Sequence, residues 1–305
     1  MAKILVTGGL GTVGKPLSIE LRRRKHEVWI SDRFHYHEPN YTRCDIGEFH
    51  QVEKLFTVTK FDFVYHLAAE FGRRNGEDFY ESLWKANAIG TKNIIRMQER
   101  LKFRMIFTSS SEVYGDYGGV MAEDVMGKVS IKQLNDYAMS KWVNEMQILN
   151  SAERFGTETV RVRLFNTYGP GEYYSEYRSA ICVFIYRALH NLSYTVYTKH
   201  KRTSSYIDDT VRTMTNVLDN FRSGEVYNIA GNNLHDMKQV SDIILDYLGK
   251  HDSLVEYRDT EEATTLEKRV DISKATRDLG HQNTISLEDG IARTIEWQKE
   301  VYGGG

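Results

Sequence analysis

The feature that most constrains this sequence is a glycine-rich turn between a short apolar strand and a helix. Lys3–Thr7 is predicted to be a buried strand, and a helix is predicted from Lys15 to Arg24. Between them, Gly9, Gly11 and Gly14 satisfy the pattern G-x-G-x-x-G. Such glycines let the backbone approach a pyrophosphate, whose charge then faces the N–H groups of the helix start. We therefore expect dinucleotide contacts from Gly8, Gly9, Gly11, Thr12, Val13 and Gly14.

An acidic residue supports this interpretation and indicates which dinucleotide binds. Asp32 ends the second predicted strand, Val28–Asp32, roughly 20 residues beyond the loop, where a carboxylate accepts hydrogen bonds from the adenosine ribose. A carboxylate there repels a 2′-phosphate, which favours NAD over NADP. The adjacent Arg33 slightly weakens that preference.

The same glycines also fit the start of a phosphate loop of nucleotide hydrolases. Gly9 to Lys15 matches G-x-x-x-x-G-K, but that motif requires Ser or Thr next, whose hydroxyl binds magnesium. Pro16 stands there instead. Proline has no hydroxyl and suits the first turn of a helix, so we reject this alternative.

Strand and helix patterns alternate along the first half of the chain. This alternation predicts a Rossmann-like, doubly wound parallel sheet with helices on both faces, an α/β fold. From Gly231 onward the sequence is charged, helical and less regular. We expect an NAD-binding domain of residues 1–167 plus about 203–230, and a smaller C-terminal substrate-binding cap of residues 168–202 plus 231–305. Further strands are predicted at 63–67, 105–108 and 159–164, and helices at 84–100 and 137–155.

Composition limits the classes of partner. The net charge of -2 provides no basic field for nucleic acid or an anionic membrane. No apolar run approaches the ~18 residues of a membrane span. The only two cysteines, Cys44 and Cys182, form neither a disulfide framework nor a metal-ligand pattern. We expect a cytoplasmic enzyme without a bound metal, a nucleic-acid partner or a membrane partner.

Tyr137 and Lys141 form the first candidate catalytic pair. They lie four residues apart in a predicted helix, so their side chains share one face. A tyrosine with a pKa near ~10 is a poor base at neutral pH, but a nearby ammonium stabilises its phenolate. Such a tyrosine can take a hydroxyl proton while the carbon gives hydride to NAD.

A hydroxyl-rich segment follows the strand that precedes this helix. Thr108, Ser109, Ser110 and Ser111 lie at the carboxyl end of the predicted sheet, where open α/β sheets bind ligands. A serine there could hydrogen-bond and polarise the reacting oxygen. Serines that only complete a turn are the plainer alternative.

Several motifs in this order resemble the NAD-dependent nucleotide-sugar epimerase/dehydratase family of extended short-chain dehydrogenases/reductases. The resemblance implies a catalytic triad of Ser110, Tyr137 and Lys141, with Glu112 beside it. It implies a nucleotide-diphosphate-sugar substrate contacted by Ser110, Ser111, Glu112, Asn166, Arg202 and Arg269. It places further NAD contacts at Arg33, Asp45, Ile46, Leu67, Ala68, Ala69, Asn87, Thr108, Tyr137 and Lys141. The motifs are residues 7–14, 66–69, 87–91, 110–115, 137–141, 163–170 and 269–275.

Members of this family first oxidise the sugar at C4 and then diverge. Ser111-Glu112 supplies the base of a 4,6-dehydratase without its usual acid. The segment also resembles the Thr-Ser-Glu motif of GDP-mannose dehydratases and UDP-glucuronate decarboxylases. Ser175 to Leu189, with Tyr177, Ile181 and Phe184, looks more like the corresponding segment of 4-epimerases. We narrowly favour a nucleotide-sugar 4-epimerase. A 4,6-dehydratase, a decarboxylase and a 4-dehydrogenase stay open.

Two further expectations follow from the resemblance. Family members pair two helices with their copies, so we expect a homodimer through helices 84–100 and 137–155. Some proteins of this fold are NAD(H)-sensing regulators without turnover. The intact Tyr137–Lys141 pair argues against that role, because a sensor does not need an activated phenolate.

Overall fold

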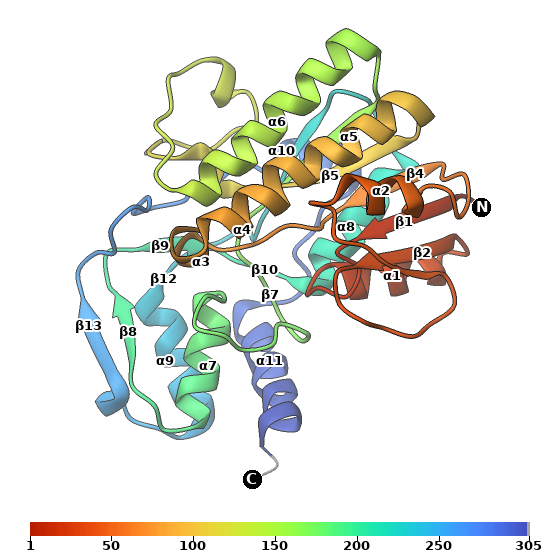
Figure 1. Ribbon diagram of the computed structural model, residues 1–305. Coiled ribbons are helices and arrows are strands. Elements are labelled where there is room, and N and C mark those ends of the chain that lie inside the picture. The colour runs from red at the N-terminus through yellow and green to blue at the C-terminus, as the bar shows by residue number, and fades with distance from the viewer. Residues whose placement is uncertain (304–305) are drawn as a thin grey trace.

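The computed structural model describes residues 1–303 and contains a seven-stranded sheet at its centre (Figure 1). All neighbouring strands pair in parallel, in the order β11-β6-β5-β4-β1-β2-β3. The predicted doubly wound parallel sheet is therefore confirmed. The strand order reverses between β1 and β4, which is where such sheets bind ligands. The strands are β1 Lys3–Thr7, β2 Glu27–Asp32, β3 Tyr41–Arg43, β4 Phe63–His66, β5 Arg104–Ser110, β6 Thr159–Leu164 and β11 Val226–Ile229.

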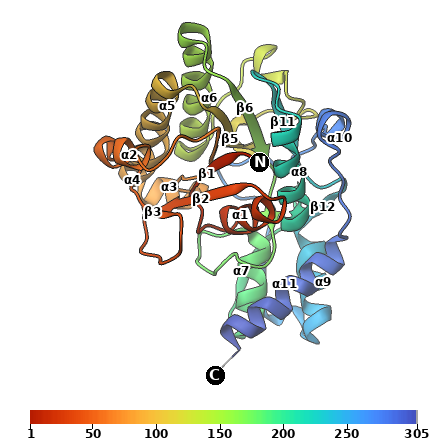
Figure 2. The same ribbon diagram turned by 90° about the vertical axis from the view of Figure 1, so that its right-hand side faces the viewer.

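Helices cover both faces of this sheet, as Figure 2 shows. On one face, α1 (Gly14–Arg23) packs on α8 (Ile207–Asp219), beside α10 (Ser273–Leu279). On the other, α5 (Gly90–Leu101) packs between α2 (Phe49–Leu55) and α6 (Asp136–Phe155). Neighbouring side chains of β1 enter different cores, Ile4 and Val6 on one face and Leu5 on the other. Burial on both faces explains why these strands are continuously apolar.

The remaining elements form the predicted cap and the rim of the cavity. Three helices pack on one another below the sheet in Figure 1: α7 (Ala180–Leu189), α9 (Met237–Leu248) and α11 (Leu287–Tyr302). Strand β8 (Tyr194–Tyr197) pairs in parallel with β13 (Val255–Arg258). The other short pairs are β9 (Lys201–Thr203) with β12 (Leu234–Asp236) and β7 (Thr167–Tyr168) with β10 (Ser205–Tyr206). All seven strands of the main sheet fall in residues 1–167 and 203–230; the domain boundaries themselves stay a prediction.

One predicted helix is interrupted. The segment expected to be helical from 84 to 100 comprises α4 (Tyr80–Trp84), one π-helical turn (Lys85–Ile89) and then α5. The π turn contains the buried Asn87. Just upstream lies α3 (Arg73–Asp78), and short 3₁₀ turns occur at Ser111–Tyr114, Val125–Gly127 and Asp252–Leu254.

Helix α6, which carries Tyr137 and Lys141, is fixed at both ends and in the middle. The Asn135 side chain accepts the Ala138 N–H at its start, and Gly156 ends it with φ 63°. In the middle, the fully buried Glu145 carboxylate accepts hydrogen bonds from Ser109 Oγ at 2.6 Å and from Arg163 Nε at 2.9 Å. Arg161 lies 3.1 Å away. The helix is thus joined to β5 and β6 by a buried ion pair.

No helix within residues 1–303 combines the length and the apolar character needed to cross a membrane.

Replacing Glu145 tests this attachment. Glu145→Gln keeps the shape but leaves two arginines buried beside a neutral amide, and losing one partner of a buried pair costs about 3–5 kcal/mol. We expect a loss of that size in the free energy of unfolding measured with urea. Glu53→Gln, which breaks the half-exposed Glu53–Arg100 pair, is the matched control and should cost about 0–1 kcal/mol. Equal losses in the two variants would contradict the anchoring role.

Candidate active site

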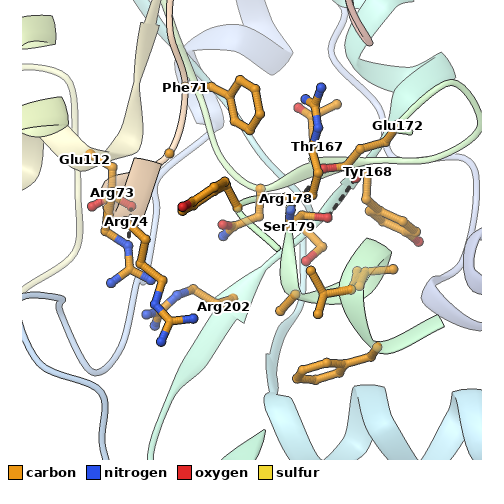
Figure 3. Close-up of a pocket in the computed structure, with 18 of the residues that line it drawn as sticks. Phe71, Arg73, Arg74, Glu112, Thr167, Tyr168, Glu172, Arg178, Ser179 and Arg202 are labelled. Atoms are coloured by element: carbon orange, nitrogen blue, oxygen red, sulfur yellow. Dashed lines mark hydrogen bonds and ion pairs between the residues drawn. The ribbon is translucent and has the colours of Figure 1, made fainter. Parts of the chain in front are cut away.

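A cavity of about 800 Å³ opens at the carboxyl ends of the central strands and extends into the cap. Its size is within the roughly 300–1,000 Å³ typical of small-molecule sites. Its walls come from the glycine loop, the end of β5, the first turns of α6, the segment after β6, and β9. Figure 3 shows Arg73, Glu112 and Arg202 on one side of this cavity, with Phe71 and Arg178 further along it. Of the predicted site residues it is lined by Thr12, Val13, Leu67, Thr108, Ser110, Ser111, Glu112, Tyr137, Lys141, Asn166 and Arg202.

The glycine loop has the geometry that a dinucleotide requires. Gly8 has φ 69°, and a Cβ on it would lie 2.7 Å from the Ala68 nitrogen. A Cβ on Gly14 would lie 2.1 Å from the Gly8 carbonyl oxygen. No side chain caps the first turn of α1. Pro16 has no N–H, and Lys15 and Leu17 donate theirs to the carbonyls of Gly11 and Val13, which leaves the Gly14 N–H at the helix start for an anion. The close neighbours of Gly8 are backbone atoms of Leu67 and Ala68, so the segment that contains Leu67, Ala68 and Ala69 lies against the loop.

Asp32, the residue predicted to bind the adenosine ribose, ends β2 beside the glycine loop. Asp32 Oδ2 accepts the Leu10 N–H at 3.1 Å, which fixes the carboxylate beside the glycine loop. The Arg33 guanidinium pairs with Glu70 at 2.5 Å. Asp45 and Ile46 follow β3 at the same edge of the sheet but, like Asp32 and Arg33, do not line the cavity. Their contacts with the adenosine half of the cofactor stay a prediction.

The buried Asn87 has a different role from the one predicted. Its side-chain Oδ1 accepts the Glu70 N–H at 2.8 Å, while Nδ2 donates to the Glu70 carbonyl at 3.1 Å and to Ser140 Oγ at 3.0 Å. Its amide is therefore occupied within the protein and does not line the cavity. We correct its assignment from a cofactor contact to a link between the segment after β4 and helix α6.

Tyr137 and Lys141 face the cavity together from α6. Lys141 Nζ lies 5.9 Å from the centre of the Tyr137 ring and donates to the Thr108 carbonyl at 2.9 Å. Burial lowers the pKa of Lys141 to about 8, although Glu145 acts in the opposite direction. Burial raises the pKa of Tyr137 to about 12, partly offset by a hydrogen bond with Ser110. Without a further positive charge, Tyr137 is therefore protonated at neutral pH.

Glu112 lies in a cluster of cations. Its carboxylate accepts from Lys268 Nζ at 2.5 Å, and Arg73 Nε is 4.0 Å away. Burial alone would raise the pKa of Glu112, but the charges of Lys268, Arg73 and Arg202 outweigh it and hold the pKa at about 2. Burial lowers the pKa of Lys268 to about 8, against the opposing effect of Glu112. Glu112 is therefore ionised throughout the neutral range.

Arg202 is positioned for an anion that the protein itself does not supply. It is buried, and its guanidinium donates to the carbonyls of Lys201 and Leu266, both at 2.8 Å. Within the described residues it has no carboxylate within 4.0 Å. Burial lowers its pKa to about 10, so it keeps its charge at neutral pH. Asn166 Nδ2, on the same wall, donates to the Thr203 carbonyl at 3.1 Å.

The predicted role of Arg269 in substrate binding is not supported. Its side chain is 58% exposed and pairs with Glu267 at 2.6 Å, outside the cavity. Its neighbour Lys268 points inward instead and contacts Glu112. Flanking β-bridges, Met121 with Val270 and Lys201 with Glu267, keep this segment extended, so successive side chains point in opposite directions. Lys268 and Arg73 were not predicted from the sequence, because no local motif indicates which residue faces inward.

The residues present fit an NAD molecule. The turn at Gly8 and Gly14 packs so closely on the protein's own backbone that no Cβ fits there, which keeps the loop narrow. The Thr108 hydroxyl, on the cavity wall, is buried without a hydrogen-bond partner among the described residues. The loop and Asp32 would hold the pyrophosphate and the ribose, and Tyr137 and Lys141 would lie beside the nicotinamide half.

Comparisons with known proteins agree with this geometry. The NAD dependent epimerase/dehydratase family matches residues 4–230. The chain is 30% identical to UDP-N-acetyl-alpha-D-glucosaminuronate decarboxylase of Bacillus cytotoxicus, over 98% of both chains. It is 28% identical to UDP-glucuronic acid decarboxylase 1 of Xenopus tropicalis, over 98% of this chain and 73% of the relative.

A solved structure has the same fold. UDP-glucuronic acid 4-epimerase from Bacillus cereus, in complex with UDP-glucuronic acid and NAD, superposes with a TM-score of 0.85 at 24% identity, covering 98% of this chain and 100% of that one. The chain therefore belongs to the NAD-dependent epimerase/dehydratase family and is an NAD-dependent enzyme of nucleotide-sugar chemistry.

Proposed function

We propose that this enzyme oxidises a UDP-linked hexuronic acid at C4 and then releases its carboxylate as CO₂. The observation that carries the proposal is the cationic cluster around the ionised Glu112, which suits a substrate with an anion in addition to its diphosphate. The two decarboxylases reported above, each matched over nearly the whole of this chain, support the same class of reaction.

The first step uses residues at the end of β5 and the start of α6. When bound, NAD would supply the acceptor for the hydride that leaves C4. The phenolate of Tyr137 takes the proton of the C4 hydroxyl, and Ser110 donates a hydrogen bond to the same oxygen. The ammonium of Lys141 stabilises the phenolate that this step requires. The C4 hydroxyl thereby becomes a ketone, and Tyr137 becomes a neutral phenol.

The second step breaks the bond between C5 and the carboxyl carbon. Its electron pair moves toward the C4 ketone, whose oxygen becomes an enolate facing Ser110 and the newly protonated Tyr137. CO₂ leaves, and C5 then takes a proton. No base removes a proton from C5 in this sequence. That agrees with a Glu112 whose pKa is held near 2, because so weak a base is poorly suited to the C5 proton transfer of a 4,6-dehydratase.

A 4-epimerase is the second candidate, and the sequence analysis favoured it. Ile181 and Phe184, from the epimerase-like segment, line the cavity, while the Tyr177 hydroxyl donates to Asp78 at 2.9 Å. An epimerase needs only room for the keto sugar to turn over before hydride returns. The two candidates share the first step and differ in the fate of the carboxylate.

The reaction in D₂O distinguishes the candidates. Purified enzyme with NAD is given UDP-glucuronate, UDP-N-acetylglucosaminuronate or UDP-glucose, while CO₂ is measured and products are examined by NMR. We expect CO₂ from a uronate and one deuterium at C5 of the product. A C4 epimer without CO₂ or deuterium would establish the 4-epimerase instead. Loss of water with deuterium at C5 or C6 would establish a dehydratase.

Tyr137→Phe tests the shared first step. We expect unchanged NAD affinity and a loss of about 10²–10⁴-fold in C4 oxidation, followed as reduced cofactor in a single turnover. In the wild type, the rate should rise as pH rises through the pKa of Tyr137 in the NAD complex, because only the phenolate accepts the proton. The positive nicotinamide should bring that pKa well below the 12 of the cofactor-free site. A Tyr137→Phe variant with near wild-type activity would refute this mechanism.

The homodimer also stays a proposal. On the two helices expected to form it, Ile94 is fully buried, and the half-buried Trp142 packs on a small internal cluster, so Ile94 is not available to a partner. Met146 and Leu149 on α6 and Ile89 beside α5 are exposed apolar side chains on these two helices.

We expect a dimer in sedimentation at micromolar concentration, and a monomer for the double variant Met146→Glu, Leu149→Glu. Ile19→Glu, on the exposed surface of α1, is the control and should stay dimeric. A monomeric wild type would rule the dimer out.

A further inference from the structure

Arg73 lies between two carboxylates at the wall of the cavity. It is the first residue of α3, a short helix that packs on α6 through Gly76 and Tyr137. Its guanidinium contacts Glu261 at 2.8 Å and lies 4.0 Å from Glu112. Figure 3 shows Arg73 directed toward Glu112, with Arg74 beside it. Arg73 is thus next to the catalytic residues without being part of the Ser110–Tyr137–Lys141 group.

The two carboxylates are not equally committed to Arg73. Glu112 is held by Lys268 at 2.5 Å, so the close ion pair of Arg73 is with Glu261. Glu261 comes from the segment after β13, and its backbone N–H donates to His200 Nε2 at 2.9 Å. With Arg202 included, three cations (Arg73, Arg202 and Lys268) face two carboxylates (Glu112 and Glu261). The site therefore has positive charge in excess before any ligand enters.

Arg73 lies where we expect the carboxylate of a bound uronate. The C4 oxygen belongs at Tyr137 and Ser110, and the diphosphate at Arg202 and Asn166. Glu112 follows Ser110 by two residues and lines the same cavity, so we place it beside C5, a ring carbon next to C4. A group on C5 that passes Glu112 reaches Arg73, whose planar fork matches a carboxylate.

We infer that Arg73 binds the sugar carboxylate of the substrate, and that Glu261 occupies this position until the substrate replaces it. The inference rests on the proposed function, because it assigns the recognition of the uronate to a residue. A sugar with a neutral CH₂OH group cannot replace Glu261 in this ion pair. Loss of the carboxylate as CO₂ removes the anion from Arg73, so Glu261 can return to it as product leaves.

The test compares three ligands that differ by one group at a time. UDP, UDP-glucose and UDP-glucuronate are titrated calorimetrically into NAD-loaded enzyme that carries Tyr137→Phe, because this background keeps NAD binding and blocks oxidation at C4. For Arg73→Met we expect about 10- to 100-fold weaker binding of UDP-glucuronate, as for the loss of a charged hydrogen bond, and unchanged binding of the other two. Arg73→Lys should restore part of the affinity. Lys199→Met, at a largely exposed lysine that pairs with Asp259 outside the cavity, controls for a general loss of positive charge.

Glu261→Gln should act in the opposite direction. It removes the competing anion, so UDP-glucuronate should bind several-fold more tightly and UDP-glucose should be unaffected. Equal weakening of UDP and UDP-glucuronate by Arg73→Met would overturn the inference and make Arg73 a diphosphate ligand. Unchanged binding of all three ligands would make Arg73 only a tether for the Glu261 segment.

These outcomes are separate from the fate of the proposed function, because binding is measured without turnover. Selective loss of UDP-glucuronate binding in an enzyme that releases no CO₂ would support Arg73 and reject the decarboxylase.

Discussion

The active site depends on the buried ion pair between Glu145 and Arg163. Tyr137, Lys141 and Glu145 are spaced four residues apart on α6 and therefore share one face of the helix. Glu145 is joined to β5 through Ser109 and to β6 through Arg163. Tyr137 and Lys141 are therefore held in a fixed position beside the ends of these strands. Because an unpaired buried charge is costly, rotation or sliding of α6 is opposed. The same carboxylate raises the pKa of Lys141 against the effect of burial, and so favours the ammonium that Tyr137 needs.

The arrangement of charge separates two tasks within one cavity. In the proposed mechanism, the groups around C4 are neutral or weakly charged. Burial raises the pKa of Tyr137 to about 12, and the positive nicotinamide would lower it. Around the proposed position of C5 the protein supplies fixed charges, because Lys268 keeps Glu112 ionised. In the proposed mechanism the oxidation at C4 does not use Glu112. On this proposal one fold would support epimerisation, decarboxylation or dehydration according to the residues that face C5.

The parts predicted correctly from sequence are those that local chemistry determines. A glycine turn between a strand and a helix has few alternatives, and Tyr137 and Lys141 share a helical face whatever the tertiary structure. The parts that failed depend on tertiary contacts. Lys268 and Arg269 are adjacent basic residues, and only the pairing of their extended segment decides which one meets Glu112. Asn87 matched a motif, but its amide is used by Glu70 and Ser140. Arg73 belongs to no motif, and its partner Glu261 lies 188 residues away along the chain.

The cap therefore does more than close the cavity. Glu112, Ser110 and Tyr137 belong to the sheet domain, whereas Arg202, Lys268 and Glu261 come from segments at or beyond β9. The ion pairs Glu112–Lys268 and Arg73–Glu261 join these two parts of the chain beside the substrate cavity. An anionic substrate that replaces Glu261 at Arg73 and meets the unpaired Arg202 would exchange a protein–protein contact for two protein–ligand contacts. Binding and the position of the cap segments would then be coupled through charge alone, and the product, which keeps the diphosphate but has lost the sugar carboxylate, would bind more weakly.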